Sequence, residues 1–462
     1  MSMAPQIAVI GSGPAGMAAA IEASDLEISV VVLDQQPAPG GQIYRGLEKQ
    51  KNSGEALFGT DYFQGRPLID AFRQNSIDYR AETQVWEVTK NKNIHFLADK
   101  SAKRIQAEQI IIAGGAQERP FPFPGWTLPG VMTAGAAQIL LKAASMGAGH
   151  AVFAGSGPLL YLIVSQYLRA GLPVTAVLET TPFSNYLRAT PHLAAGVSVP
   201  SYLVKGLRLM AELRRADVPW ISGVEDLRVG GADKVEAVSY CKNGSWHKIE
   251  TEHLFTHQGI VPDINLSISI GCDHFWNTVQ ACWQVERDGW GETSVDGISV
   301  AGDGAGIGGA TAARLQGRIA AISAAYRLGV ISVDERDRRS KKPLGDLARE
   351  LRARKFLDIL YQPRGSFRGF LDDQTVVCRC ENITAGEVRA AAELGCQGPN
   401  QLKAFTRAGM GPCQGRQCGL TVSETMAQTF DLGVDEIGYL RTRSPILPVT
   451  LGALAGFNDS KN

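Results

Sequence analysis

Residues 6–34 read QIAVIGSGPAGMAAAIEASDLEISVVVLD, and this stretch predicts the architecture of the first domain. An apolar run, a glycine-rich turn, a helical segment and a second apolar run follow one another, which is the order of a βαβ unit. The turn satisfies the dinucleotide-binding pattern G-x-G-x-x-G and consists of Gly11, Ser12, Gly13, Pro14, Ala15 and Gly16. Gly11 permits the tight turn, Gly13 lets the backbone approach a pyrophosphate, and Gly16 lets the helix pack close to the strand.

An acid ends the second apolar run. Asp34, with Gln35 beside it, can accept hydrogen bonds from ribose hydroxyls, and its charge would repel a 2′-phosphate. The pyrophosphate would lie at the N-terminus of the helix, where free N–H groups favour negative charge. The turn and the acid together predict a bound dinucleotide.

The same unit recurs at residues 150–179, where AVFAG, GSGPLL, a helical segment and VTAVLE follow one another. Gly155 lies 144 residues after Gly11, so the chain contains a duplicated nucleotide-binding architecture. Leu160 stands at the position where Gly or Ala would let the helix pack close to the strand. Glu179, at the end of the unit, would still suit an NAD ribose. We therefore expect a scaffold domain that does not use a pyridine nucleotide in the usual way.

Other segments predict how the domains are connected. Residues 110–116 (IIIAGGA) read as a buried parallel strand, and residues 118–130 carry four prolines and are expected to cross between domains. The predicted fold class is α/β, with two Rossmann-like dinucleotide-binding domains and a small C-terminal helical domain. The expected parts are a discontinuous first domain (1–125 and 255–330), a degenerate second domain (126–254), a charged linker with one helix striped by Leu347, Leu351 and Leu360 (331–370), a cysteine module (371–435) and a tail (436–462).

The composition excludes several classes of function. Lys plus Arg number 46 and Asp plus Glu number 46, so no net charge favours nucleic acid or an anionic membrane. The first basic residue is Arg45, which predicts no export signal, and the longest stretch without charged residues, 143–168, is broken by glycine and proline. We expect a cytoplasmic protein without an integral membrane segment.

Four of the eight cysteines form two close pairs near the C-terminus. Cys378 and Cys380 form C-x-C, and Cys413 and Cys418 form C-x4-C after 32 intervening residues. Two such pairs can supply four thiolates to one iron–sulfur site, and four cysteines also bind zinc. The spacer predicts two helices, the first opened by a capping box from Thr384 to Glu387, and Cys418 begins a third.

The surroundings of these cysteines refine the prediction. Cys396 is expected to be a small buried apolar residue. The nearby basic residues either offset the charge of a cluster or keep the surface soluble; they are Arg379, Lys403, Arg407 and Arg416. No C-x-x-C is present, so a disulfide relay of the thioredoxin-reductase type is disfavoured.

Three segments resemble flavoproteins with two dinucleotide-binding domains, the FAD/NAD(P)-type reductase fold. SVAGDG at 299–304 resembles their FAD-binding strand, in which the acid, here Asp303, contacts the ribityl–phosphate region. With IIIAGGA and GGQIYR, the resemblance favours FAD and implies contacts from Gly41, Gln42, Ala113, Gly114, Gly302 and Asp303. Val85 lies where such folds hold the adenine through backbone groups, or is an ordinary strand residue.

Nearly the whole chain resembles the alpha subunits of heteromeric amino-acid and opine dehydrogenases, namely opine oxidase, hydrogen cyanide synthase and D-hydroxyproline dehydrogenase. The matching strings are GSGPAG, PGGQIYR, GAQERPFPFPGWTLPGVMTAGAAQ, AGSGPLL, HQGIVPD, AGDGAGIGGA and the cysteine module. Within that module, CRCENIT and GMGPCQGRQCG resemble bacterioferritin-associated-ferredoxin-like 2Fe–2S domains. The resemblance therefore implies a 2Fe–2S cluster on Cys378, Cys380, Cys413 and Cys418.

The resemblance also implies a division of labour between subunits. A β subunit of the D-amino-acid or sarcosine oxidase type oxidises the C–N bond at its own FAD, an FMN bridges the subunits, and the alpha subunit passes electrons to a quinone or dye. A further small subunit is part of some assemblies, and the acceptor could bring the protein to the inner membrane peripherally. An opine of the octopine or nopaline type is the expected substrate. Some relatives hold only ATP or ADP in the first site, and the residues here leave FAD and an adenine nucleotide both open.

Within the family, the alpha subunit of hydrogen cyanide synthase or of D-hydroxyproline dehydrogenase is the alternative to the opine enzyme. Outside it, two other functions compete with this interpretation: a self-sufficient NADH-dependent ferredoxin reductase, and a zinc-stabilised nucleotide-binding scaffold. We assign no catalytic residue, because no histidine stands in a nucleophile or acid–base motif. His257 is the histidine that we place nearest a flavin, and a structural hydrogen bond is the preferred role for it.

Overall fold

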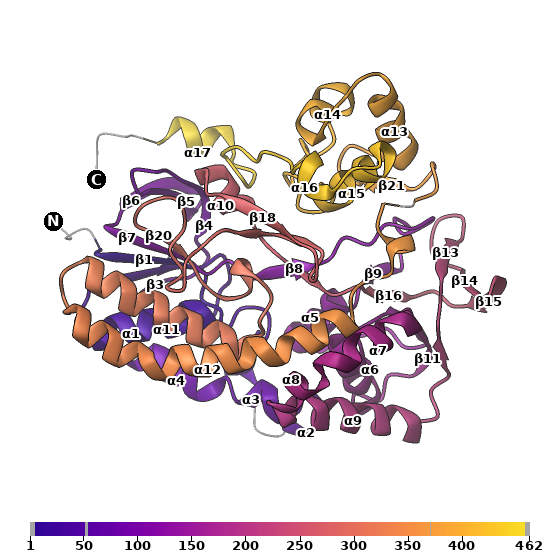
Figure 1. Cartoon of the computed structure of the whole chain (residues 1–462), viewed down its shortest axis with the longest axis horizontal. Coiled ribbons are helices and arrows are strands. Elements are labelled where there is room, and N and C mark those ends of the chain that lie inside the picture. Colours follow the sequence, from indigo (N-terminus) through magenta and orange to yellow (C-terminus); the bar gives the residue numbers. More distant parts are fainter. Residues whose placement is uncertain (1–4, 51–53, 370, 458–462) are drawn as a thin grey trace.

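The first domain is built on a five-stranded parallel sheet. The computed structural model describes residues 5–50, 54–369 and 371–457, and Figure 1 shows two α/β domains with a smaller helical module beside them. The sheet order is β20-β7-β1-β2-β3, with β1 (Ile7–Ile10), β2 (Val30–Leu33), β3 (Asp78–Arg80), β7 (Gln109–Ile112) and β20 (Ile298–Val300). Every residue of β1, β2, β7 and β20 is buried, as in parallel sheets covered on both faces. The βαβ unit predicted at 6–34 is confirmed.

Helices and smaller sheets complete this domain. The helices are α1 (Pro14–Asp25), α2 (Glu55–Phe58), α3 (Thr60–Phe63), α4 (Arg66–Gln74), α10 (Asn265–Ile270) and α11 (Ala310–Arg327). The smaller sheets are β4 (Gln84–Val88) with β5 (Asn93–Ala98) and β6 (Ser101–Gln106), and β18 (His274–Asn277) with β19 (Cys282–Val285). α1 and α11 pack closely, because an added Cβ on Gly317 would lie 2.0 Å from the carbonyl oxygen of Ala15.

The second domain repeats the parallel arrangement in the order β12-β11-β10-β16-β9. Its strands are β9 (Val131–Thr133), β10 (Ala151–Gly155), β11 (Val174–Glu179), β12 (Trp220–Ser222) and β16 (Leu254–His257), with an antiparallel sheet of β13 (Asp226–Gly230), β14 (Ala237–Lys242) and β15 (Ser245–Glu250). Its helices are α5 (Ala134–Ala144), α6 (Pro158–Arg169), α7 (Phe183–Ala189), α8 (Leu193–Val197) and α9 (Pro200–Arg215).

The two crossings between the domains lie side by side. β8 (Ala116–Glu118) pairs antiparallel with β17 (Ile260–Pro262), and residues 119–130 contain no helix or strand, as their prolines predict. The predicted boundary at residue 255 needs correction, because it falls inside β16, which pairs with β10. The chain leaves the second sheet only after His257, because a strand belongs to the sheet with which it forms its ladder.

The predicted linker contains one long helix, α12 (Val333–Leu360). Ser332 caps it by accepting a hydrogen bond from the N–H of Glu335 at 3.3 Å. Leu347 and Leu360 are buried as predicted, but Leu351 is 39% exposed, so the predicted stripe is wrong at that position. α12 packs against α11 in the first domain and against α7 and α8 in the second, so it joins the two domains rather than extending into solvent (Figure 1).

The cysteine module consists of β21 (Val376–Cys378), β22 (Ile383–Thr384), α13 (Ala385–Glu393), α14 (Pro399–Thr406), α15 (Gly419–Phe430) and α16 (Val434–Ile437). The capping box from Thr384 to Glu387 is present, and Cys418 caps α15, as predicted.

Residues 436–457 do not form a simple tail, which corrects the predicted boundary at 435; the rest of the predicted tail, 458–462, lies outside the described residues. Ile437 and Leu440 belong to the core of the module, and Ile446 packs into the core of the first domain, where its N–H donates to the carbonyl oxygen of Trp86 at 3.0 Å. α17 (Leu451–Ala455) follows. Because burial of these apolar side chains is favourable, this segment packs against the first domain instead of extending into solvent. Of the helices in the described ranges, none is both long and apolar enough to cross a membrane.

Candidate functional site

The turn between β1 and α1 leaves no room for side chains at two positions. At Gly11, φ is +100°, and an added Cβ would lie 2.5 Å from the carbonyl oxygen of Ala113. At Gly16, an added Cβ would lie 1.8 Å from the carbonyl oxygen of Gly11. Any side chain there would push α1 away from β1, so the turn has the close strand–helix packing that the glycine pattern requires.

The other side of the same turn is open. The atom nearest to an added Cβ on Gly13 is Gly41 Cα at 3.8 Å. Added Cβ atoms on Gly114 and Gly115, directly after β7, would meet no atom of the described residues within 4 Å. Ligands of parallel α/β sheets bind at the carboxyl ends of the strands, where these backbones lie. A pyrophosphate at the N-terminus of α1 fits this cradle.

Both predicted acids are held by hydrogen-bond donors of the chain. Asp34 Oδ2 accepts from the N–H and the hydroxyl of Ser12 at 2.5 and 2.6 Å, and its Oδ1 accepts from the N–H of Gln36 at 2.7 Å. Asp303 Oδ1 accepts from the N–H groups of Gly308 and Gly309 at 2.9 and 2.8 Å, ahead of α11. The carboxylates are therefore fixed in place by the protein itself.

The remaining predicted residues lie in three different environments. Gly41 and Gly302 lie against the turn, because added Cβ atoms there would come within 2.8 Å of Gly13 Cα and of Ala15 Cβ, respectively. Gln35 and Gln42 are exposed. The Val85 side chain is buried in the core of the first domain, so only its backbone is available to a ligand.

Lys142 of α5 is a buried residue to which no sequence pattern points. Its Nζ donates to the carbonyl oxygen of Ile43 at 3.0 Å and to Gln138 Oε1 at 3.1 Å, and lies 5.1 Å from the centre of the Tyr62 ring. It therefore anchors the loop that carries Gly41 and Gln42. Burial lowers the pKa of Lys142 to about 7.

This buried lysine predicts a pH dependence of stability. Its pKa in the folded chain lies below its ordinary value of 10.5, so between pH 7 and 10.5 the unfolded chain binds more protons. We expect the free energy of unfolding to rise with pH in this window, and Lys142→Met to remove that contribution. Urea unfolding at pH 6.5–9.5 measures the slope, with the exposed Lys103→Met as control. Equal slopes for Lys142→Met and wild type would contradict the assignment.

Segment 360–364 of the chain packs beside the second glycine turn. Tyr361 Cγ would lie 3.9 Å from an added Cβ on Gly157, the position where a pyrophosphate would approach. The Tyr361 ring packs edge-on against Tyr161, and Asn185 Nδ2 donates to the carbonyl oxygens of Leu360 and Gln362 at 3.1 and 2.9 Å.

Two further contacts occupy the same site. Glu179, which ends β11, is 2% exposed. Burial raises the pKa of its carboxylate, and the positive charge of Arg364 opposes this shift. His257 Nδ1 lies 2.7 Å from Glu118 Oε1, and its ring also lies against Gly157. His257 thus has the structural hydrogen bond expected of it. Tyr361 and His257 therefore lie in van der Waals contact with the second glycine turn, where a pyridine nucleotide would approach, and Leu160 is a fully buried core residue.

We expect that neither NADH nor NADPH reduces the flavin of the isolated chain. Tyr361→Ala should open the glycine turn and strengthen NADH binding at least about tenfold, equivalent to ~1.4 kcal/mol, as measured by calorimetric titration. Tyr326→Ala, at the end of α11, is the control. Rapid bleaching of the wild-type flavin by NADH would contradict this prediction.

The four predicted cysteines interact as two crossed pairs. The Cys418 thiol donates to Cys378, and this hydrogen bond lowers the pKa of Cys378 to about 6 and raises that of Cys418. Cys380 interacts with Cys413, and burial raises the pKa of Cys380. Backbone N–H groups of Gly409 and Glu381 also donate to Cys378. Cys378 and Cys380 of the C-x-C pair therefore interact with Cys418 and Cys413 of the C-x4-C pair, respectively.

This arrangement suits a thiolate-ligated group. Within residues 5–50, 54–369 and 371–457, no three or more His, Cys, Asp or Glu side chains already form a metal-binding geometry. The donor set nevertheless fits an iron–sulfur cluster, because the four thiols interact electrostatically with one another and backbone N–H groups donate to Cys378. Cys396 is fully buried, as predicted.

The nearby basic residues have structural partners. Arg407 pairs with Glu381 at 3.0 Å, Lys403 donates to the carbonyl oxygen of Arg441 at 2.7 Å, and Arg379 lies over the Trp126 ring. Arg416, between Cys413 and Cys418, contacts Asp263 of the first domain through Nε at 3.2 Å.

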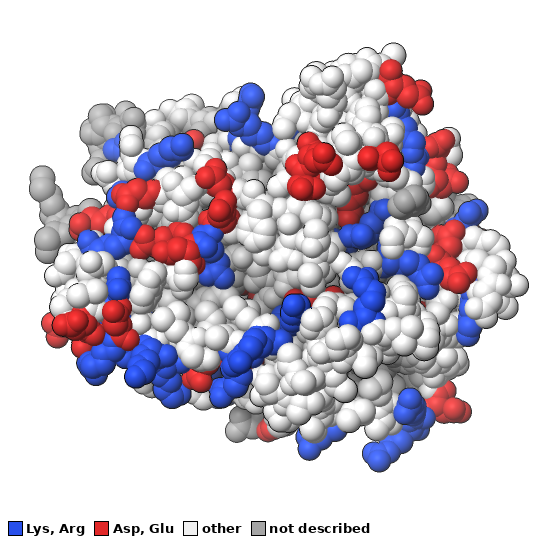
Figure 2. All heavy atoms as spheres, viewed as in Figure 1, with Lys and Arg blue, Asp and Glu red and all other residues white. Residues whose placement is uncertain are grey.

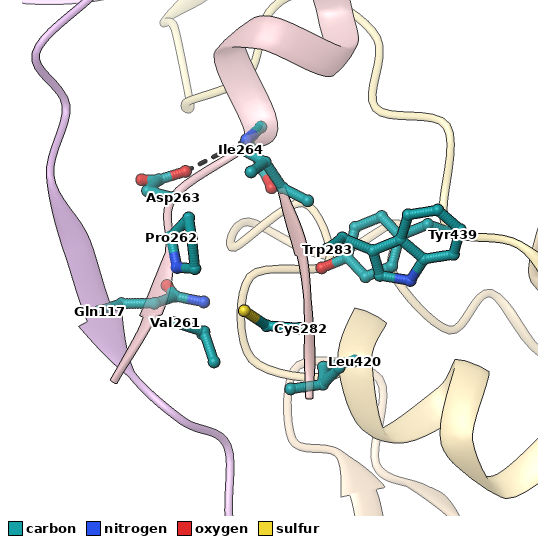
Figure 3. Close-up of a pocket in the computed structure, with 10 residues that line it drawn as sticks. Gln117, Val261, Pro262, Asp263, Ile264, Cys282, Trp283, Leu420 and Tyr439 are labelled. Carbon is teal, nitrogen blue, oxygen red and sulfur yellow. Dashed lines mark hydrogen bonds between the residues drawn. The ribbon is translucent and has the colours of Figure 1, made fainter. Parts of the chain in front are cut away.

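Asp263 connects the two candidate sites. Its N–H donates to the carbonyl oxygen of Gly115, in the open cradle, at 3.0 Å, while its carboxylate holds Arg416. Gln117 Nε2 and Asn265 Nδ2 also donate to carbonyl oxygens of the cysteine loop, those of Arg416 and Gln414, at 2.7 and 2.8 Å. Figure 3 shows the small pocket at this junction, where Cys282 and Trp283 face Leu420 and Tyr439 of the module.

Comparisons with known proteins agree with this geometry. Residues 5–329 match the family of pyridine nucleotide-disulphide oxidoreductases, and residues 372–457 match the sarcosine oxidase A3 domain. The opine oxidase A chain of Rhizobium meliloti is 43% identical over 97% of this chain and 87% of its own length; that of Agrobacterium tumefaciens (strain Ach5) is 44% identical over 97% and 90%. This protein belongs to the family of opine oxidase A subunits. Within the same comparison, hydrogen cyanide synthase subunit HcnB of Pseudomonas aeruginosa is 31% identical over 96% of this chain and 97% of HcnB.

Solved structures support the fold of this member of the opine oxidase family. L-proline dehydrogenase from P. horikoshii has a TM-score of 0.70 and 19% identity, covering 97% of this chain and 79% of its own. Thioredoxin reductase from T. acidophilum has a TM-score of 0.51 and 18% identity, covering 71% and 99%. The chain is an oxidoreductase subunit with an FAD-dependent oxidoreductase fold.

Proposed function

We propose that this chain is the electron-transfer subunit of a heteromeric dehydrogenase that oxidises the C–N bond of an opine of the octopine or nopaline type. Removal of two electrons and two protons from the C–N bond gives an imine, which water hydrolyses to an amino acid and a 2-oxo acid. This oxidation takes place on a partner β subunit of the D-amino-acid or sarcosine oxidase type. The chain delivers the electrons to a quinone or dye in the cytoplasm or at the inner membrane surface.

FAD in the first site and a 2Fe–2S cluster in the module would supply two-electron and one-electron redox chemistry. Gly13, Gly114 and the N-terminus of α1 form the cradle for the pyrophosphate, while Asp34 is held by Ser12 of the glycine turn and Asp303 by N–H groups ahead of α11. Cys378, Cys380, Cys413 and Cys418 supply the thiolates. FMN at the subunit interface is part of the proposal, and ATP or ADP is the alternative occupant of the first site.

The observation that carries this proposal is Asp263, which bonds both Gly115 of the cradle and Arg416 of the cysteine loop. Through it, the cysteine loop is fixed beside the carboxyl end of β7, so a group on the thiolates and a group in the cradle are neighbours. The packing of Tyr361 beside the glycine turn at Gly157 supports an electron source other than NADH. The identity to opine oxidase A subunits favours an opine substrate.

The experiment is co-purification with the candidate β subunit, followed by assays of octopine- and nopaline-dependent dye reduction. The expected result is substrate-dependent reduction together with iron in the purified complex. A complex that is correctly loaded with flavin but inactive on every opine would overturn the opine assignment, and formation of hydrogen cyanide would assign the chain to a hydrogen cyanide synthase instead. Zinc in place of iron would overturn the electron-transfer role.

Asp263, which bonds both the cradle and the cysteine loop, provides a more specific prediction. Asp263→Asn keeps the side-chain shape but weakens the charged contact with Arg416, so we expect dye reduction to fall about tenfold, equivalent to ~1.4 kcal/mol in the barrier. Reduction of the partner flavin by substrate should be unchanged, as stopped-flow absorbance can show. Arg407→Gln, which removes an ion pair within the module, is the matched control. An equal loss in both variants would mean that the module is merely destabilised.

A further inference from the structure

Three consecutive helices of the second domain expose large apolar side chains. Phe183 of α7 is 75% exposed, and Leu187 of α7 and Leu207 of α9 are both 63% exposed. The complete set, named here the α7–α9 face, is Phe183, Tyr186, Leu187, Leu193, Val197, Val204 and Leu207. Contiguous exposed apolar surface on a folded domain marks an interaction site.

This face is separate from the surfaces by which the same helices pack onto the domain. α9 buries Leu209 and Leu213 in the domain core, and Ala189, at the end of α7, is buried against Ile359 and Leu360 of α12. α8 contacts both α9 and α12. In Figure 2, the surface over α7, α8 and α9 is mostly uncharged, and Lys and Arg gather at its edges. The exposed apolar set is therefore a second, outward-facing surface.

The charge around the α7–α9 face favours one kind of occupant. Residues 183–215 contain five basic residues, Arg188, Lys205, Arg208, Arg214 and Arg215, but a single acid, Glu212, although the whole chain has equal numbers of both signs. Glu212 is paired with Arg169 at 2.6 Å and Lys205 is paired with Asp61, so Arg188, Arg208, Arg214 and Arg215 carry the excess positive charge. If a second copy of this chain docked here, the basic rims of the two copies would face each other, and their repulsion would cost free energy. Another protein with an acidic rim would instead complement the basic rim of this face.

We propose that the α7–α9 face docks the β subunit of the heteromeric enzyme through an apolar patch with an acidic rim. This inference rests on the proposed function, because the matched relatives are named as subunits and this chain then needs a surface for another polypeptide. Apolar anchors at the centre supply affinity, and the basic rim steers association.

The test compares binding of the β subunit to the wild-type chain and to the double variant Leu187→Glu/Leu207→Glu. We expect the double variant to bind at least about 100-fold more weakly, because two charges would be buried in the contact. Arg208→Glu should slow association about tenfold at low salt, with less effect at high salt. Leu394→Glu is the matched control, because Leu394 is 75% exposed on the cysteine module. Unchanged thermal unfolding and flavin content show that the variants fold.

Three results would overturn the proposal. The first is that the double variant and the wild type bind the β subunit equally well. The second is that the double variant loses self-association while its complex with the β subunit stays intact. The third is that it loses binding to phosphatidylglycerol vesicles while that complex stays intact. Complex formation is measured without substrate, so a stable complex that does not oxidise opines refutes the proposed function and leaves the docking surface standing.

Discussion

Replacing Cys413 by serine should abolish the iron-dependent visible absorption of the chain and lower opine-dependent dye reduction at least about 100-fold, equivalent to ~2.7 kcal/mol in the barrier. Cys413 interacts with Cys380 and, through charge, with Cys418, so the change removes one of the four sulfurs that would hold the cluster. A serine hydroxyl is a much poorer ligand for iron than a thiolate. Iron analysis, electron paramagnetic resonance after dithionite and steady-state dye reduction measure these effects.

The matched control is Cys396→Ser in the same module. Cys396 is fully buried, and its thiol donates only to the carbonyl oxygen of Gly398 at 3.5 Å, so the substitution tests stability rather than ligation. We expect Cys396→Ser to retain iron and activity. If Cys413→Ser keeps its full iron content, or if the control loses as much iron, the assignment of the four ligands is wrong.

Gly16→Ala should remove the cofactor from the first site. The added methyl group would lie 1.8 Å from the carbonyl oxygen of Gly11 and 3.2 Å from Val9 Cγ1, so α1 must move away from β1. Overpacking of this kind costs about 1–3 kcal/mol or more, and the N-terminus of α1 no longer lies where a pyrophosphate would bind. We expect flavin content below about one tenth of wild type and a lower Tm.

Gly345→Ala distinguishes this steric effect from the loss of a glycine in general. Gly345 lies in α12, where an added Cβ would meet no atom of the structurally described chain within 4 Å. Alanine in a helix interior is more favourable than glycine by about 0.5–1 kcal/mol, so this variant should be slightly more stable and keep its flavin. Normal flavin content and Tm in Gly16→Ala would contradict the interpretation of the turn.

Much of the fold followed from short-range patterns. Both βαβ units, the capping box from Thr384 to Glu387 and the helix that begins after Cys418 were predicted from neighbouring residues, because propensity, capping and glycine sterics act within a few positions. The contacts of Gly11, Gly16 and Asp34 agree with the roles that spacing gives them. Their contact with a cofactor stays a prediction.

The wrong predictions concern segments whose environment is distant in the chain. The residues after 435 look like a tail because they are rich in proline and glycine, yet Ile446 packs into the first domain. Leu351 fits the helical period of a buried stripe, but the neighbours that α12 meets leave it exposed. Lys142 has no motif, and its role depends on Ile43, which lies 99 residues away.

The sequence by itself determined the two nucleotide-binding units and the four clustered cysteines, because these depend on local spacing, while the family followed from the resemblance of longer strings to known subunits. Tertiary structure alone decided that Tyr361 packs beside the second glycine turn, that the cysteine pairs cross, and that Asp263 joins Gly115 to Arg416, which lies 153 positions after it. Such contacts form only when the whole chain packs, since burial of apolar surface, rather than local propensity, brings distant segments together.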